Sequence, residues 1–380
     1  MGAGLAGLRS VQELRKQGFD GEITVIGAEP HRPYDRPPLS KNLLLGRVEP
    51  DDIGLLTPED EKTADWLLGR TVTAVEPAAV TLDDGERITA NGIVLAAGAR
   101  PRRLPLPDLP GVHTLRTVED ALALRAAIRP GARLTIVGAG LIGSEVAAAA
   151  STLGATVTVL EVDSEPFVRL FDPSAAALLR AEHAEHGVTI HPSTAVTDVG
   201  GAGRVEWAGL PDGTRLPTDV LLVSVGAVPN IEFLAGSPVA CDRGVLTDEF
   251  GQTNVDRVVA VGDIARYRSA AGEPVRYEHW TNARDMPPTA IAALLAQLNG
   301  GAALPAAYDP VPYFWSDQYG HHIQLAGQVR PGDDIELLEG SLAERRFVLQ
   351  HRRDGRPVAV VGWDSPRMFN RLRKSLRRSA

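Results

Sequence analysis

The sequence has 380 residues, a formal net charge of −9 and a pI near 5.5. This acidic balance argues against general nucleic-acid binding, and no apolar run reaches the length that spans a membrane. A single cysteine, Cys241, excludes an internal disulfide framework and a redox pair of cysteines. The sequence shows no secretory signal pattern, so we expect a cytoplasmic protein of two or three domains without a metal site.

The first predicted element is a glycine-rich turn with the spacing G-x-G-x-x-G, formed by Gly2, Gly4 and Gly7. A helix with an apolar stripe follows, and a strand over residues 23–26 then leads to Glu29. The order of turn, helix, strand and terminal acid is typical of a βαβ unit that binds a dinucleotide.

A strand before Gly2 is missing from this first unit. In a doubly wound sheet that strand is central and buried on both faces, so its absence would leave ladder groups unpaired. One explanation is a start placed too late in the chain. The other is a real loss of the strand, which would weaken the first nucleotide site.

The next segment, residues 31–41, is a stiff loop with three prolines that carries the cations Arg36 and Lys41. Its composition alone fits a solvated surface loop equally well. Residues 71–75 and 79–82 are predicted as strands of a hairpin, with a turn at Asp83-Asp84-Gly85. A buried strand over 92–101 then runs into a proline-rich linker that ends at Pro110.

The second glycine turn lies in a complete βαβ unit. A strand over 134–137 leads into Gly138, Gly140 and Gly143, a helix covers 141–153, and a second strand ends at Glu161. The first glycine permits the tight turn, the second lets the backbone approach a pyrophosphate, and the third allows close packing of helix and strand. A carboxylate at the end of the second strand suits a ribose 2′-hydroxyl and repels a 2′-phosphate. NADH is therefore favoured over NADPH, although Arg169 weakens that preference slightly.

After this unit, Asp172 is predicted to cap a helix over 173–186. Strands are expected near 188–190, 205–208 and 220–225. The apolar strand over 257–263 ends in Gly262-Asp263 and is expected to rejoin the first domain.

The sequence pattern changes in the last part of the chain. A helix is expected over 287–298, and alternating strands from about residue 303 predict a small antiparallel sheet. Its aromatic cluster at 313–319 is more typical of a core than of a cofactor contact. The basic tail, 367–378, has apolar residues on one helical face, which is typical of a solvated terminal helix.

Taken together, these motifs resemble the ferredoxin and rubredoxin reductases that supply bacterial oxygenases, a family similar to putidaredoxin reductase. The resemblance covers nearly the whole chain in the family's order. Its most specific strings are Pro38-Leu39-Ser40-Lys41, Glu278-His279-Trp280-Thr281-Asn282-Ala283 and Phe314-Trp315-Ser316-Asp317-Gln318.

The resemblance implies an α/β fold with two Rossmann-like dinucleotide-binding domains of the glutathione reductase type and a small α+β C-terminal domain. The expected boundaries are 1–108 with 230–302 for the FAD-binding domain, 109–229 for the NAD-binding domain and 303–380 for the C-terminal interface domain. The implied activity is transfer of a hydride from NADH to FAD and of single electrons to a ferredoxin or rubredoxin, by a monomer or homodimer.

The resemblance also implies site residues. Lys41 and Glu145 match the family's ion pair beside the flavin edge that receives the hydride, and they are the expected catalytic pair. The first cofactor set holds FAD, and comprises Gly2, Gly4, Gly7, Glu29, Arg36, Lys41, Val75, Arg100, Gly262, Asp263, Trp280 and Trp315. The second set holds NADH, and comprises Gly138, Gly140, Ile142, Gly143, Glu161 and Gly226.

Two alternatives remain open at this point. An oxidase, peroxidase or disulfide reductase on the same fold needs a redox cysteine beside the flavin, and Cys241 lies far in sequence from the N-terminal loops. The missing first strand motivates the second alternative, which is a degenerate relative that binds NADH but little or no FAD and has a regulatory role.

Overall fold

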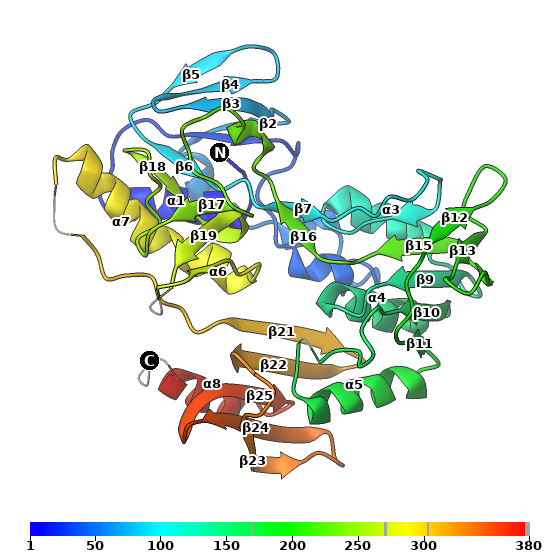
Figure 1. Ribbon diagram of the computed structural model, residues 1–380. Helices are drawn as coiled ribbons and strands as arrows, with labels where there is room; N and C mark the ends of the chain where they lie inside the picture. The colour runs from blue at the N-terminus through cyan, green and yellow to red at the C-terminus, as the bar shows by residue number, and fades with distance from the viewer. Residues whose placement is uncertain (169, 270–271, 302–303, 377–380) are drawn as a thin grey trace. The chain divides into compact units, whose positions relative to one another are not determined.

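The computed structural model describes residues 1–168, 170–269, 272–301 and 304–376 (Figure 1). The chain divides into two compact units, and each contains segments that lie far apart in sequence. Unit 1 comprises residues 1–35, 53–100 and 228–312, and unit 2 comprises 36–52, 101–227 and 313–380. No helix within the described residues is both long enough and apolar enough to cross a bilayer. The three domains predicted from the sequence stay a prediction.

Unit 1 is built on two pairs of parallel strands covered by helices. Strand β1 pairs with β2, and β6 pairs with β18. Helix α1 packs against α6 and α7, and α7 also packs on β18. The bounds of these elements are α1 Leu5–Lys16, β1 Thr24–Gly27, β2 Asp65–Leu68, β6 Ile93–Leu95, β18 Val258–Ala260, α6 Trp280–Asp285 and α7 Pro287–Leu298.

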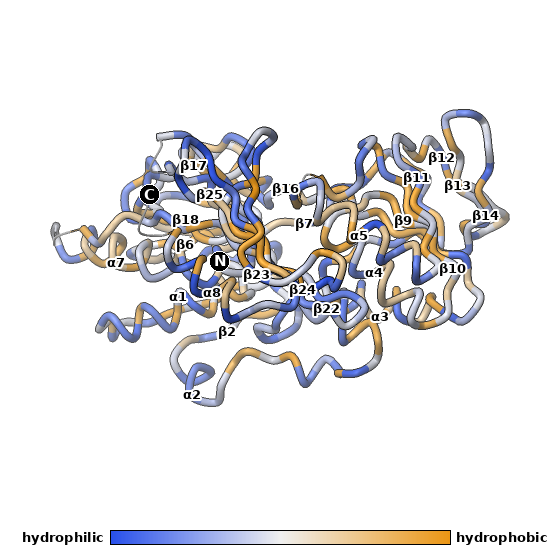
Figure 2. The backbone as a smooth tube through the Cα atoms, turned by 90° about the horizontal axis from the view of Figure 1, so that it is seen from below, coloured by the Kyte–Doolittle hydropathy of each residue, from blue (hydrophilic) through white to orange (hydrophobic). Residues whose placement is uncertain are grey.

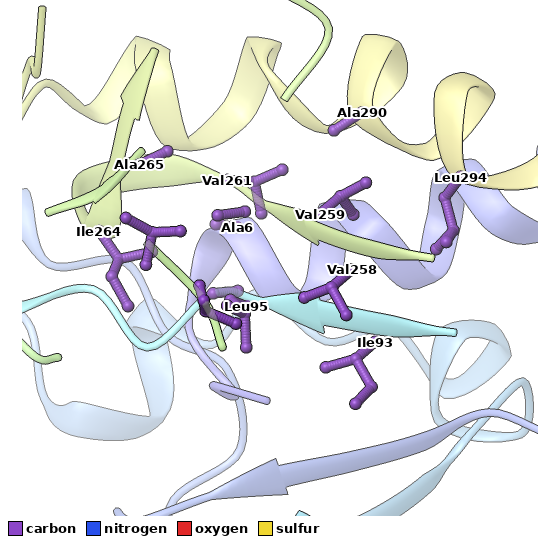
Figure 3. Packing of buried hydrophobic residues seen from close by; sticks show 14 of the residues in the cluster. Ala6, Ile93, Leu95, Val258, Val259, Val261, Ile264, Ala265, Ala290 and Leu294 are labelled. Carbon is purple, nitrogen blue, oxygen red and sulfur yellow. The ribbon is translucent and has the colours of Figure 1, made fainter. Parts of the chain in front are cut away.

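Aliphatic side chains from these elements form the core of unit 1 (Figure 3). Leu95, Val258 and Val259 are fully buried there, together with Ile264. The pairing of β18 with β6 confirms that the apolar strand near residue 260 rejoins the first segment of the chain.

Smaller elements complete unit 1. An antiparallel sheet has the order β3-β4-β5, and a mixed sheet has the order β17-β19-β20. The predicted turn at Asp83-Asp84-Gly85 joins β4 to β5, and the short strand β5 itself was not predicted. The bounds are α2 Pro58–Glu61, β3 Val72–Glu76, β4 Ala79–Leu82, β5 Arg87–Thr89, η3 Glu232–Leu234, β17 Val245–Thr247, η4 Gly262–Ile264, β19 Ala265–Arg268 and β20 Pro274–Val275.

Unit 2 contains a five-stranded parallel sheet with the order β11-β10-β9-β15-β8. Its central strands are buried along almost their whole length and form an apolar layer (Figure 2). Helix α4 packs on β9 and β10, and α5 packs on β11. The bounds are β8 Val112–His113, α3 Val118–Ala127, β9 Arg133–Val137, α4 Leu141–Thr152, β10 Thr156–Leu160, α5 Pro173–Glu185, β11 Thr189–His191 and β15 Val220–Val223, with the side sheet β12 Asp198–Gly200, β13 Trp207–Gly209 and β14 Arg215–Pro217.

Asp172 caps α5 as predicted. Its Oδ1 accepts hydrogen bonds from the backbone N–H groups of Ser174 at 2.9 Å and Ala175 at 3.2 Å. The cap satisfies two amide groups that have no partner within the helix.

The C-terminal part of unit 2 is an antiparallel sheet with the order β21-β22-β25-β24-β23, which confirms the small antiparallel sheet predicted from about residue 303. Helix α8 packs on β25 through the fully buried Phe369, so the apolar face of the basic tail is covered and its charged face is exposed. The last two residues of that tail, 377 and 378, lie outside the described residues. The bounds are β21 Tyr313–Gln318, β22 His321–Gly327, β23 Asp334–Ser341, β24 Arg346–Arg353, β25 Arg356–Trp363 and α8 Pro366–Leu376. Unit 2 also contains η1 Pro37–Ser40, and the boundaries in sequence between the units fall within η2 Pro50–Ile53, β7 Ala99–Pro101 and β16 Ala227–Pro229.

Candidate nucleotide sites and a buried ion pair

The first glycine turn, in unit 1, is shaped by close backbone contacts. Gly2 has φ +101°, and a Cβ there would lie 2.1 Å from the carbonyl oxygen of Ala96. A Cβ at Gly7 would lie 1.9 Å from the carbonyl oxygen of Gly2, whereas a Cβ at Gly4 would meet nothing within 4 Å. The outer glycines therefore permit the fold, and the middle one leaves space in front of α1.

The second turn, in unit 2, has the same arrangement. Gly138 has φ +102°, and a Cβ there would lie 2.4 Å from the carbonyl oxygen of Ser224. A Cβ at Gly143 would lie 2.2 Å from the carbonyl oxygen of Gly138, and one at Gly140 would again meet nothing within 4 Å. The same steric solution thus occurs in both units.

The helices that follow these turns begin without a side-chain cap. Gly4 caps α1 and Gly140 caps α4, and neither helix has an acidic residue in its first turn. The first amide groups of each helix, which have no intrahelical partner, are therefore available to an anion, and the helix dipole favours negative charge there. Both turns fit the pyrophosphate of a dinucleotide.

Glu161 follows β10 and is directed at the second turn. Its Oε2 accepts the backbone N–H of Ala139 at 2.6 Å, and its Oε1 accepts that of Asp163 at 2.9 Å. Ile142 in the first turn of α4 is 41% exposed, and Gly226 has φ +92° with open space around it. Arg169, the nearby cation, lies outside the described residues.

In unit 1, the acids predicted to bind sugar hydroxyls lie near the first turn. Glu29, just after β1, accepts a hydrogen bond from the hydroxyl group of Tyr34. Asp263 lies in η4, which packs against the start of α1 because Gly262 approaches Ala6: a Cβ at Gly262 would be 3.0 Å from the Cβ of Ala6.

Trp280 begins α6 and donates its indole N–H to Asp35 Oδ1 at 2.7 Å. Val75 is only 4% exposed in the core of unit 1, so only its backbone is available to a nucleotide. Arg100 is exposed and forms an ion pair with Glu232, with an N–O distance of 2.5 Å.

Lys41 and Glu145 form a buried ion pair in unit 2. Lys41 Nζ lies 2.9 Å from Glu145 Oε1, and the side chains are 12% and 5% exposed. Lys41 follows η1, and Glu145 is the fifth residue of α4, which begins at the second glycine turn. The structure therefore brings together the proline-rich loop and the helix of the second βαβ unit.

The exposed side of this pair is bordered by β21. The ring of Trp315 has its centroid 5.7 Å from Lys41 Nζ, and Asp317 Oδ2 lies 4.0 Å from the same atom. Burial acts to raise the pKa of Asp317, but the hydrogen bond to His322 and the charge of Lys41 outweigh it, so the pKa lies below its usual range. Arg36 donates to the carbonyl oxygen of Arg116 at 2.6 Å.

Sequence reasoning missed the polar groups that surround Glu145. Ser316 Oγ donates to Glu145 Oε1 at 2.7 Å, and Ser40 Oγ donates to Oε2 at 2.5 Å. Gln318 Nε2 in turn donates to Ser316 Oγ at 2.9 Å. The sequence did contain a signal for these groups. Side chains alternate between the two faces of a strand, so a strand over 313–318 places residues 316 and 318 on one face.

The predicted site residues are divided between the units, and their roles in binding and catalysis stay predictions. Unit 1 holds Gly2, Gly4, Gly7, Glu29, Val75, Arg100, Gly262, Asp263 and Trp280. Unit 2 holds Arg36, Lys41, Gly138, Gly140, Ile142, Gly143, Glu145, Glu161, Gly226 and Trp315.

Comparison with known proteins gives consistent matches. Residues 1–286 match the family of pyridine nucleotide-disulphide oxidoreductases, and residues 313–380 match the reductase C-terminal family. The chain is 40% identical over 375 residues to the ferredoxin reductase component of chlorobenzene dioxygenase from Cupriavidus sp. (strain PS12), covering 97% of this chain and 89% of that one. It is 38% identical over 381 residues to the ferredoxin–NAD(+) reductase subunit of a benzene 1,2-dioxygenase system from Pseudomonas putida, covering 98% and 91%.

Solved structures agree with these matches. The reductase in a covalent putidaredoxin reductase–putidaredoxin complex is 32% identical with a TM-score of 0.92, covering 100% of this chain and 92% of that one. The structure of Fdr9 is 35% identical with a TM-score of 0.89, covering 100% and 94%. The expected fold class is confirmed, and the chain belongs to the pyridine nucleotide-disulphide oxidoreductase family, among its ferredoxin reductases.

Proposed function

We propose that this protein passes a hydride from NADH to FAD and then single electrons to a ferredoxin or rubredoxin that serves an oxygenase. The observation that carries the proposal is the repeated glycine turn, in which the middle glycine of each copy, Gly4 and Gly140, opens on free space at a helix N-terminus. One protein with two such sites can hold two dinucleotides, and the named relatives are ferredoxin reductases of dioxygenase systems.

FAD is assigned to the turn of unit 1. Bound FAD supplies the chemistry of accepting two electrons and releasing them one at a time. The first amide groups of α1 would hold its pyrophosphate, because they are uncapped. Glu29 would accept a hydrogen bond from the adenosine ribose, and Asp263, in η4 beside the start of α1, would accept one from the ribityl chain. Trp280, fixed by its hydrogen bond to Asp35, would line the isoalloxazine ring.

NADH is assigned to the turn of unit 2. The uncapped start of α4 would hold the pyrophosphate, and Glu161 would accept the ribose 2′-hydroxyl. Because Glu161 already accepts backbone N–H groups from Ala139 and Asp163, its carboxylate is held in place beside the turn. A 2′-phosphate would meet this fixed negative charge, which supports NADH as the substrate.

The Lys41–Glu145 pair is proposed to be the charged group nearest to the reacting rings. Burial of both side chains makes their interaction stronger than that of a surface pair, and neither charge is left without its partner. The pair would present the Lys41 ammonium in a fixed direction. The protein thus contributes position and charge and needs no acid–base triad.

Disulfide reductase chemistry is not supported for this chain, although the family name includes it. The sequence has one cysteine, Cys241, whereas the attack of a thiolate on a disulfide and its resolution use a pair. Burial raises the pKa of the Cys241 thiol, which lowers the fraction of reactive thiolate further.

An absorption spectrum of the purified protein tests the proposal. Bound oxidised flavin gives a yellow protein whose visible band is bleached by NADH under anaerobic conditions. Added ferricyanide should then restore the band. A colourless protein that binds NADH but takes up no added FAD would contradict the proposal and favour the degenerate, non-redox alternative.

A further inference from the structure

Strand β21 presents two polar side chains to the buried interface with α4. Ser316 is fully buried and Gln318 is 2% exposed, and both lie on the face opposite Trp315 and Asp317. Helix α4 packs against this strand and contributes Ser144 and Glu145. Hydrogen bonds between its members offset the cost of burying such a polar cluster. Among the described residues, the Gln318 amide nitrogen has two partners and its Oε1 has none.

In this cluster, the Gln318 amide is the donor and the hydroxyl groups of Ser316 and Ser144 are its acceptors. Gln318 Nε2 donates to Ser316 Oγ at 2.9 Å and to Ser144 Oγ at 3.0 Å. Each serine hydroxyl group has a single proton to donate. Ser144 donates to the carbonyl oxygen of Leu141 at 3.0 Å, and Ser316 donates to Glu145 Oε1 at 2.7 Å. The two hydroxyl groups can therefore only accept from Gln318, which has the two N–H groups they need.

This arrangement also fixes the orientation of the amide. If Gln318 were reversed, its carbonyl oxygen would face both hydroxyl groups and would attract the Ser316 proton away from Glu145. The described orientation leaves that proton on the carboxylate.

Glu145 consequently receives a donor at each oxygen. Ser316 and Lys41 reach Oε1, and Ser40 reaches Oε2 at 2.5 Å. Three donors around two carboxylate oxygens define one position of that group, and the position in turn defines the direction of the Lys41 ammonium.

We propose that Gln318 is a positioning residue that holds the Lys41–Glu145 pair through the Ser316 hydroxyl. The inference rests on the proposed function, because it assumes that this pair serves the reaction with NADH. Gln318 itself lies behind Ser316 and acts only through it. Ser316 is the link, and Ser144 supplies the second acceptor that keeps the amide from turning.

Lysine-selective acetylation followed by mass spectrometry tests the contact directly. The chain has four lysines, and Lys16, with 72% of its side chain exposed, serves as an internal reference for Lys41, which is 12% exposed. We expect Gln318→Met and Ser316→Ala to increase the acetylation rate of Lys41 relative to Lys16 by about tenfold, which corresponds to loss of one hydrogen bond of ordinary strength. Ser316→Thr, which keeps the hydroxyl group, should restore most of the protection.

Stopped-flow reduction by NADH gives the second readout. Gln318→Met should lower the limiting rate of flavin reduction by about tenfold. The NADH concentration that gives half that rate should change little, because none of the residues assigned to NADH binding belongs to this cluster. Gln350→Met is the matched control, since Gln350 is a buried glutamine (3% exposed) of the same sheet.

The two proposals can fail separately. Equal Lys41 acetylation and equal reduction rates in Gln318→Met and Gln350→Met would overturn the positioning role, even if NADH bleaches the flavin normally. If NADH fails to bleach the wild-type protein, the proposed function fails, and the acetylation of Lys41 still shows whether Gln318 holds the pair. A variant that does not fold is replaced by Ser316→Ala, which reports on the same link.

Discussion

Glu161 Oε2 accepts the backbone N–H of Ala139 at 2.6 Å, so the acid after β10 is joined directly to the second residue of the glycine turn. This bond places a negative charge beside the start of α4 before any nucleotide binds. A ribose hydroxyl can replace the amide as a donor to this carboxylate, whereas a phosphate cannot.

The first prediction concerns nucleotide preference. Glu161→Arg should lower kcat/KM for NADH by about ten- to a hundredfold, the range expected when a charged hydrogen bond is lost, and should improve the use of NADPH. Steady-state kinetics with both nucleotides measure the ratio. Glu206→Arg, at an exposed position of the same unit, makes the same charge change and should leave the ratio unchanged. An unaltered preference in Glu161→Arg would show that Glu161 does not contact the ribose.

The second prediction separates the two kinds of glycine in the turn. Gly140→Ser should keep or raise the melting temperature, because serine is a good N-cap and a Cβ there meets nothing within 4 Å. It should nevertheless raise KM for NADH, since the new side chain occupies the space in front of α4. Gly143→Ala should instead cost about 1–3 kcal/mol of stability, because its Cβ would lie 2.2 Å from the carbonyl oxygen of Gly138. Thermal unfolding and NADH titration measure both effects, and equal unfolding temperatures for the two variants would contradict the steric argument.

The third prediction concerns stability at low pH. Arg133 holds the pKa of Asp219 at about 2 through a paired hydrogen bond to its carboxylate, which lies between the starts of β9 and β15. A lowered pKa in the folded state means stability that is present above about pH 4 and is lost as the pH falls towards 2. Asp219→Asn should therefore cost about 1 kcal/mol at neutral pH, a value reduced from the full shift because the side chain is 38% exposed, and the difference from wild type should vanish near pH 2.

Chemical denaturation at a series of pH values measures this difference. The exposed Asp108→Asn provides the control and should show little difference from wild type across the series. A penalty for Asp219→Asn that stays constant down to pH 2 would rule out the ion pair as its cause.

The fourth prediction concerns the partner protein. Helix α8 exposes Arg371 and Lys374 on the face opposite Phe369, and such a cationic face suits an acidic ferredoxin. Lys374→Glu should slow ferredoxin-dependent cytochrome reduction several-fold at low salt, and raising the salt should slow the wild type too. Turnover of NADH with ferricyanide should barely change. Lys62→Glu, at an exposed lysine of unit 1, is the matched control, and equal effects of the two variants would exclude docking at α8.

Much of the fold could be predicted from local pattern. Both glycine turns are followed by helices and strands close to the expected positions, because periodicity and glycine spacing are local signals. Strand β23 was missed, since the polar–apolar alternation of Asp334-Ile335-Glu336-Leu337 is short and is interrupted by an irregularity between Leu337 and Glu339. The Asp83-Asp84-Gly85 turn lies where it was predicted, but strand β5 after it was missed because its three residues gave no distinct signal.

The ion pair was harder to predict than the turns. Lys41 and Glu145 come from segments far apart in sequence, and only the resemblance to a family suggested that they meet. The serine and glutamine residues around Glu145 belong to the strings that carry the resemblance, but those strings do not show that their side chains reach Glu145. Their importance depends on which face of β21 meets α4, which is a property of tertiary packing and is absent from any local window.

Strand β21 serves two purposes with six residues, because its side chains alternate between Trp315 and Asp317 on one side and Ser316 and Gln318 on the other. Adding or removing one residue upstream within the strand would exchange the two sides at once. The aromatic ring would then be pressed into the polar cluster, and the hydroxyl group would point to solvent. Homologous reductases that share this ion pair should therefore tolerate altered residue types in this segment more readily than any change in its length.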